Sequence, residues 1–394
     1  MDMPKIYTQD NSDVESQKLN AAKNLYRSGD YAGALNIYLD LSSASFSHKL
    51  YHEIGRCYYR LNDIESAEKN LLQSIKLESK KNPAYYLLGN LYKKQNDINH
   101  AIEYWMGAYA YRPDDTAATL NLATSYSSKN MKPESMHFYE KYLMYSKDKT
   151  TDEYLGIKDM LDTYVKTRAD LYKRAKIEIN SNRLSEAREI LEYSQEQVPA
   201  DFNTYYLLGK LCAQEKDYTK ALKYLLQAHC ADFRSLDVLQ MMYSVMSSLR
   251  NNTGSYCCLK RMIPLVVNNQ KTYLDIMRAT RQLEGTFSPD IYQEHYERAE
   301  DYYRDNHYKL ALYEYENSIL INGKIAPNFD SKIQRLKYFF NPEERIIKSC
   351  MEKGTSNYSL GNYNTSNKYF TRIMSLTTSD SKDYKFAKSR LVNV

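Results

Sequence analysis

Residues 55–67 read GRCYYRLNDIESA, and residues 89–101 read GNLYKKQNDINHA. The second stretch begins 34 residues after the first, and the two agree in residue type as well as in spacing. A glycine opens each stretch, a tyrosine follows, and an alanine closes it after an Asn-Asp pair. Several columns sharing one period indicate an internal repeat, so the fold follows from one unit and its copies.

Each unit is predicted to be a pair of helices. Apolar residues recur at helical spacing on both sides of a short turn of the Asn-Asp or Gly-Asp type. We expect Gly55 and Gly89 on the first helix, and Ala67 and Ala101 on the second, to lie where the two helices cross closely. A larger side chain would not fit at such a crossing.

The repeat resembles the tetratricopeptide repeat. The resemblance is carried by the first-helix segments YHEIGRCYY, YYLLGNLYK and YYLLGKLCA and by the turn segments GDYAGAL, KDYTKAL and NHYKLAL. It implies an all-α fold: a right-handed superhelical α-solenoid of about nine helix-turn-helix repeats in two or more sub-arrays, with a C-terminal capping helix.

Interruptions of the period predict the domain organisation. The register is weakest in the seventh and ninth repeats. We expect a polar N-terminal tail at 1–14, an array of four repeats at 15–150, a connecting helix at 151–167, a middle array at 168–267, a helical connector at 268–291, and C-terminal repeats with an insertion and a capping helix at 292–394.

Nothing in the sequence predicts catalysis. It contains no phosphate-binding glycine loop, zinc-protease motif, nucleophile elbow or kinase signature. His48 and His52 are at helical spacing but have no third ligand nearby, so we expect solvated or partner-facing histidines and no metal site. We predict that the protein is not an enzyme and needs no cofactor.

Composition and charge predict a soluble cytoplasmic protein. The N-terminal residues 1–17 lack the apolar core of a secretory signal. The longest apolar run, at 262–267, is far shorter than the roughly 20 residues of a membrane span, so no membrane insertion is expected. The six cysteines form no CxxC pair, which favours buried thiols in a reducing compartment. A net charge of +5 is too small by itself to indicate nucleic-acid binding.

The resemblance implies that ligands lie on the concave surface, which is lined by the first helix of each unit. There the sequence places a row of cations with interleaved aromatic residues. The candidate partner-binding residues are Lys23, Tyr26, Arg27, His52, Arg56, Tyr59, Arg60, Tyr86, Asn90, Lys93 and Lys94, followed in the sixth unit by Tyr206 and Lys210. Such a row suits an extended acidic peptide, with carboxylates paired to arginine and the peptide backbone bonded by an asparagine amide. A face that is merely solvated is the alternative.

We therefore predict a non-catalytic scaffold or adaptor that binds protein or peptide segments, acidic ones in particular, in its concave groove. Two alternatives stay open. One is an RNA-binding helical solenoid that uses the basic, tyrosine-bearing groove, although nucleic acid is the less favoured partner. The other is a regulatory or accessory subunit of an enzyme complex.

Overall fold

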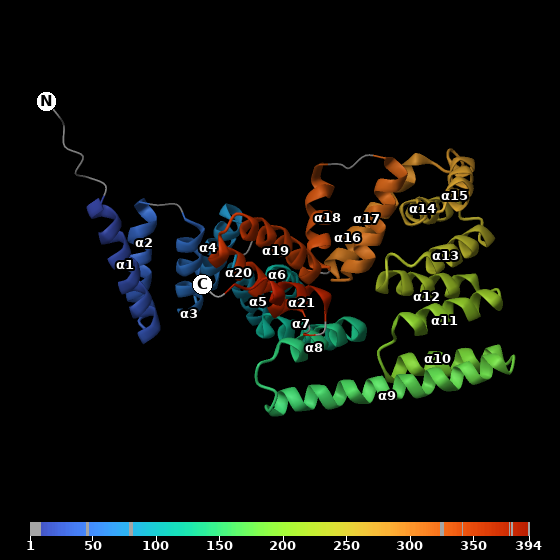
Figure 1. Cartoon of the computed structure of the whole chain (residues 1–394), viewed down its shortest axis with the longest axis horizontal. Coiled ribbons are helices and arrows are strands. Elements are labelled where there is room, and N and C mark those ends of the chain that lie inside the picture. The colour runs from blue at the N-terminus through green and yellow to red at the C-terminus, as the bar shows by residue number, and fades with distance from the viewer. Residues whose placement is uncertain are drawn as a thin grey trace. The chain divides into compact units, whose positions relative to one another are not determined.

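The computed structural model describes residues 9–44, 47–78, 82–323, 327–340, 342–377, 379 and 381–392. Every regular element in these ranges is a helix, which confirms the predicted all-α class (Figure 1). The chain forms two compact units: unit 1 joins Met1–Ser125 to Phe339–Val394, and unit 2 is Tyr126–Tyr338. The handedness of the superhelix and the number of repeats stay predictions.

Unit 1 draws its helices from both ends of the chain. They are α1 (Gln9–Ser28), α2 (Tyr31–Ala44), α3 (His48–Arg60), α4 (Ile64–Leu77), α5 (Ala84–Lys94), α6 (Ile98–Tyr111), most of α7 (Thr116–Ser128), α19 (Pro342–Ser359), α20 (Tyr363–Leu376) and α21 (Lys382–Ser389).

Unit 2 holds the helices between them. They are the end of α7, α8 (Lys132–Tyr145), α9 (Asp152–Asn180), α10 (Leu184–Gln197), α11 (Phe202–Gln214), α12 (Tyr218–Ala231), α13 (Leu236–Ser248), α14 (Asn252–Met262), the short 3-10 helix η1 (Ile263–Leu265), α15 (Gln270–Leu283), the 3-10 helix η2 (Pro289–Ile291), α16 (Tyr292–Arg304), α17 (Tyr308–Asn322) and most of α18 (Pro327–Phe339).

The turn inside each helix pair depends on one residue with a left-handed backbone. Asn62 and Asn96 have φ values of 64° and 61°, a conformation that asparagine adopts more readily than most residues. The aspartate that follows caps the next helix: the Asp63 carboxylate accepts a hydrogen bond from the Ser66 backbone N–H at 3.1 Å. In the Asn-Asp pair of the repeat, the asparagine therefore reverses the chain direction and the aspartate caps the start of the next helix. Left-handed residues also occur at Asn130, Asn182, Lys216, Arg250 and Asn306.

The small residues mark close helix crossings, as the sequence predicted. A Cβ atom added to Gly55 would lie 2.7 Å from Leu71 Cγ, and one added to Gly89 would lie 2.4 Å from Trp105 Cδ1. Ala67 and Ala101 on the second helices are completely buried. Each first helix thus packs directly against a large side chain of its own partner helix.

Several predicted segments have different bounds in the structure. The connecting helix predicted at 151–167 is not a separate element, because α9 runs without interruption from Asp152 to Asn180. It begins at the cap Thr151, and Gly156 is its only glycine and does not break it. Residues 1–8 of the predicted tail lie outside the described residues, and α1 begins within that tail at Gln9. The predicted capping segment contains the short helix α21, whose Ala387 is buried.

Within unit 1, the C-terminal helices pack against the third repeat. Figure 1 shows α19 beside α6. Arg372 on α20 donates two hydrogen bonds to the Asp114 carboxylate, at 2.6 and 2.8 Å, and Arg345 on α19 donates to the Ala110 carbonyl at 2.5 Å. Burial would raise the pKa of Asp114, but the bonds and charge of Arg372 outweigh it and hold that pKa below its ordinary value. The two hydrogen bonds from Arg372 to Asp114 thus join residues that are 258 positions apart in the sequence.

Arg372→Met should lower the free energy of unfolding by about 1–2 kcal/mol, because it removes a charge-assisted pair that is about three-quarters buried. Urea unfolding of the full chain measures the loss. Arg278→Met is the matched control, since Arg278 pairs with Asp275 on an exposed surface and should contribute less than about 0.5 kcal/mol. Equal losses would mean that the Arg372 contact is no stronger than a surface pair.

Within unit 2, α17 is joined to α12 and α14 around Arg261, whose side chain is 9% exposed. Arg261 on α14 donates to Asn317 Oδ1 at 2.5 Å and to the Tyr313 carbonyl at 3.0 Å, and its guanidinium lies 4.5 Å from the centre of the Tyr313 ring. His229 on α12 packs edge-on against the same ring and is 1% exposed. Neither ring nitrogen of His229 has a hydrogen-bond partner among the described residues.

Candidate functional site

The candidate residues predicted on the first three repeats all lie in unit 1, on three first helices. We call the surface formed by Lys23, Tyr26 and Arg27 on α1, Arg56, Tyr59 and Arg60 on α3, and Tyr86, Lys93 and Lys94 on α5 the cationic stripe. Tyr206 and Lys210 lie on α11 in unit 2, so they form a separate surface.

Arg56 is held between two neighbours and is not freely solvated. Its guanidinium carbon lies 3.8 Å from the centre of the Tyr26 ring, and Nη1 is 3.0 Å from Glu53 Oε2. Burial would raise the pKa of Glu53, but the His52 hydrogen bond and the Arg56 charge hold it below its ordinary value. Glu53 therefore stays ionised and partly neutralises Arg56.

The same cation-on-aromatic arrangement recurs along the stripe. Arg60 lies 5.1 Å from the Tyr31 ring centre and donates to the Tyr31 hydroxyl at 2.9 Å. Lys94 lies 4.9 Å from the Tyr59 ring centre and donates to Asn62 Oδ1 at 3.1 Å. In each case a cation of one repeat rests on a tyrosine of the preceding repeat. Such contacts restrict the cation without removing its charge.

Two predicted positions differ from the expectation of an exposed binding face. His52 is 8% exposed and bonds Glu53, so it belongs to the packed interior. Asn90 uses its side-chain oxygen to accept hydrogen bonds from Trp105 Nε1 at 3.1 Å and from Asn121 at 3.4 Å. That oxygen is therefore committed within the fold.

Other members of the stripe face solvent. Lys23 and Arg27 are exposed, and among the described residues neither forms an ion pair or a side-chain hydrogen bond. Lys93 is exposed and rests 5.7 Å from the Trp105 ring. In unit 2, Tyr206 stacks on Phe202 with ring centres 6.0 Å apart, while Lys210 is exposed.

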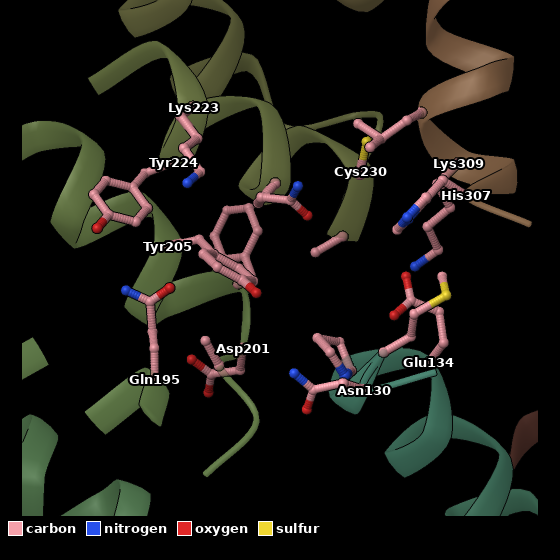
Figure 2. Close-up of a pocket in the computed structure, with 17 residues that line it drawn as sticks. Asn130, Glu134, Gln195, Asp201, Tyr205, Lys223, Tyr224, Cys230, His307 and Lys309 are labelled. Carbon is pink, nitrogen blue, oxygen red and sulfur yellow. The ribbon is translucent and has the colours of Figure 1, made fainter. Parts of the chain in front are cut away.

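A hollow in unit 2 was not predicted from the sequence. It has a volume of about 380 Å³ and lies between the starts of α8, α11 and α17, the end of α10, and one face of α12 (Figure 2). Its polar and aromatic lining includes Glu134, Gln195, Asp201, Tyr205, Lys223, Tyr224, Gln227, His307 and Lys309. Burial raises the pKa of Tyr205 to about 12, so its hydroxyl stays protonated.

Metal chemistry has no assembled site in the part of the chain that the structure describes. That part contains no group of three or more His, Cys, Asp or Glu side chains able to hold a metal ion. All six cysteines are buried thiols outside any disulfide. No described helix is long and apolar enough to cross a membrane.

The fold and these surfaces define a helical-repeat protein with exposed charged and aromatic side chains. Models of the tetratricopeptide repeat match residues 48–81, 83–115 and 172–235. The chain thus contains tetratricopeptide repeats over these residues. Proteins of this kind are interaction scaffolds, and the chain is one in that general sense.

Relatives match parts of the chain. The uncharacterized protein ycf37 of Cyanophora paradoxa is 29% identical over 108 residues, which are 27% of this chain and 58% of that protein. BBSome complex member BBS4 of Mus musculus is 26% identical over 106 residues, 27% of this chain and 20% of that protein. The chain therefore spans less than two thirds of either relative. Among solved structures, the TPR2AB-domain:pHSP90 complex of yeast Sti1 is 12% identical, covering 69% of this chain and 99% of that one, with a TM-score of 0.28.

Proposed function

We propose that the chain is a non-catalytic adaptor whose cationic stripe binds an extended acidic peptide segment of a partner protein. The observation that carries the proposal is the repeated placement of an arginine or lysine on a tyrosine of the preceding repeat. Acidic side chains at regular intervals along a peptide would meet these cations in turn.

The stacked cations are partly preorganised. A long side chain loses conformational freedom when it binds, and this loss opposes binding. Because the tyrosine rings already restrict Arg60 and Lys94, less freedom remains to be lost. Both side chains are exposed and keep donor groups available to a carboxylate. Lys23 and Arg27, which form no ion pair with any described residue, add attraction over a longer range, which salt weakens.

The test reverses two exposed charges, Arg27→Glu and Lys94→Glu, in one variant. Their exposure leaves the helices intact, while the reversal turns attraction into repulsion. We expect the Kd for a fluorescein-labelled glutamate-rich peptide to rise about tenfold or more, which corresponds to about 1.4 kcal/mol. Fluorescence anisotropy at low salt measures it, and circular dichroism checks the fold.

The matched control is Lys382→Glu with Lys385→Glu on α21 in the same unit, which should change the Kd little. Equal effects of the two variants would show that only net charge matters, and no effect of either would remove the stripe as the binding site. Random single-stranded RNA is tested in the same assay. RNA binding that is tighter than peptide binding and falls steeply with salt would favour the RNA-binding alternative.

A further inference from the structure

Two opposite charges face each other across the hollow in unit 2. Glu134 projects from the first turn of α8 and Lys309 from the first turn of α17, and Figure 2 shows their ends directed toward one another. Neither forms an ion pair or a side-chain hydrogen bond with any other described residue. Two charges that face each other without contact leave room for a group between them.

The fold gives only a partial reason for an acid at position 134, where the first turn of α8 favours a negative charge but burial opposes it. Burial raises the pKa of Glu134, and its own backbone N–H and the charges of Lys309 and His307 offset only part of that rise. A half-buried carboxylate that has no ion-pair partner among the described residues lowers the stability of the protein. Residues that bind ligands often lower stability in this way, because they are placed for the bound state.

The rim of the hollow is held in place on two sides. Lys129 donates to the Asp305 carbonyl at 2.8 Å and to Asn306 Oδ1 at 2.9 Å. Lys132 donates to the Glu196 carbonyl at 2.9 Å. These bonds fix the turn before α8 against the turn before α17 and against the end of α10. The hollow is thus formed before any ligand arrives.

We propose that the hollow binds a peptide segment in which a basic residue adjoins an acidic one, with the basic side chain on Glu134 and the acidic side chain on Lys309. The rings of Tyr205 and Tyr224 provide walls for the apolar stems of both side chains. Lys223, exposed and without an ion pair among the described residues, offers the peptide a further cation. The site lies in unit 2 and shares no residue with the cationic stripe, so it goes beyond the proposed function and is tested independently of it.

The probe is the blocked dipeptide acetyl-Arg-Glu-amide, titrated into the full-length protein by saturation-transfer NMR. Acetyl-Arg-Arg-amide and acetyl-Glu-Glu-amide are the like-charge comparisons, and free phenylalanine supplies an ammonium and a carboxylate without a peptide bond. We expect the mixed dipeptide to bind in the millimolar range and about tenfold more tightly than either like-charge dipeptide. Tighter binding of free phenylalanine would overturn the assignment to a peptide in favour of a small zwitterion, and equal binding of all dipeptides would overturn the charge pairing.

Glu134→Gln and Lys309→Met should each weaken binding of the mixed dipeptide about tenfold. Glu189→Gln on α10 and Lys173→Met on α9 make the same charge changes at exposed positions outside the hollow and should leave it unchanged. Glu134→Gln should also keep or raise the melting temperature, which separates a ligand-facing carboxylate from a structural one. Unchanged binding in both hollow variants, or a melting temperature several degrees lower in Glu134→Gln, overturns the proposal.

Discussion

Gly89→Leu is expected to lower the free energy of unfolding of unit 1 by about 3 kcal/mol or more. The added Cβ alone would lie 2.4–2.5 Å from Cδ1 and Nε1 of the Trp105 ring. That ring is completely buried and donates a hydrogen bond to Asn90, so it has no free space into which to move. The α5–α6 pair must separate or the indole must leave its rotamer.

Gly156→Leu is the matched control for this substitution. Gly156 lies in α9, and an added Cβ would meet no atom within 4 Å. Leucine there should stabilise the helix by about 0.5–1 kcal/mol, because glycine is a poor helix former. Urea unfolding followed by circular dichroism compares the two variants. Similar stabilities would mean that Gly89 does not lie at a helix crossing.

Acid should destabilise unit 2 through His229. Burial, helped by the charge of Arg261, lowers the pKa of His229 from its ordinary value of 6.5 to about 3. In the unfolded chain His229 is therefore protonated below about pH 6.5, whereas in the folded chain it stays neutral until about pH 3. Stability falls as the pH drops through this window, and at about pH 4 the loss from this one group is about 3 kcal/mol.

His229→Leu removes this loss. Wild type should lose about 3 kcal/mol more than the variant between about pH 7 and pH 4, measured by urea unfolding at each pH. Phe233→Leu is the control, because the Phe233 ring contacts the same imidazole but has no titratable group. It should shift stability by the same amount at both pH values. A His229→Leu profile parallel to that of wild type would show that His229 is protonated in the folded protein.

The repeat unit was predictable because its determinants are local. The spacing of Gly89 and Ala101 is enough to predict where their two helices cross. The Asn-Asp pair predicts both a residue with a left-handed backbone and the N-cap of the next helix. The period reaches further than the sequence pattern suggested: Arg250 has a left-handed φ of 56°, 34 residues after Lys216 at 64°. The turn of the seventh repeat thus keeps the 34-residue register, although its residue types do not match those of the other turns.

The exposure of individual site residues was less predictable. His52 was assigned to an exposed face, but it is 8% exposed in the structure, where α2 of the preceding repeat also packs on α3. Asn90 was assigned to a ligand, and the sequence does not reveal that Trp105 reaches it. The hollow brings together Glu134 and Lys309, which lie in separate repeats. No local spacing brings such residues together, so only the tertiary structure could reveal it.

Unit 1 is built from both ends of the chain, so its parts become available in a fixed order during translation. Asp114 leaves the ribosome 258 residues before Arg372, the residue that clamps it. At about 5–20 residues per second, this separation amounts to a delay on the order of 10 to 50 seconds. Tyr109 and Ala110, each 1% exposed in the finished protein, lie on the α6 edge that the late helices complete. For that interval the nascent chain carries an unfinished third repeat, and all of unit 2 is synthesised before the repeat receives its last contacts.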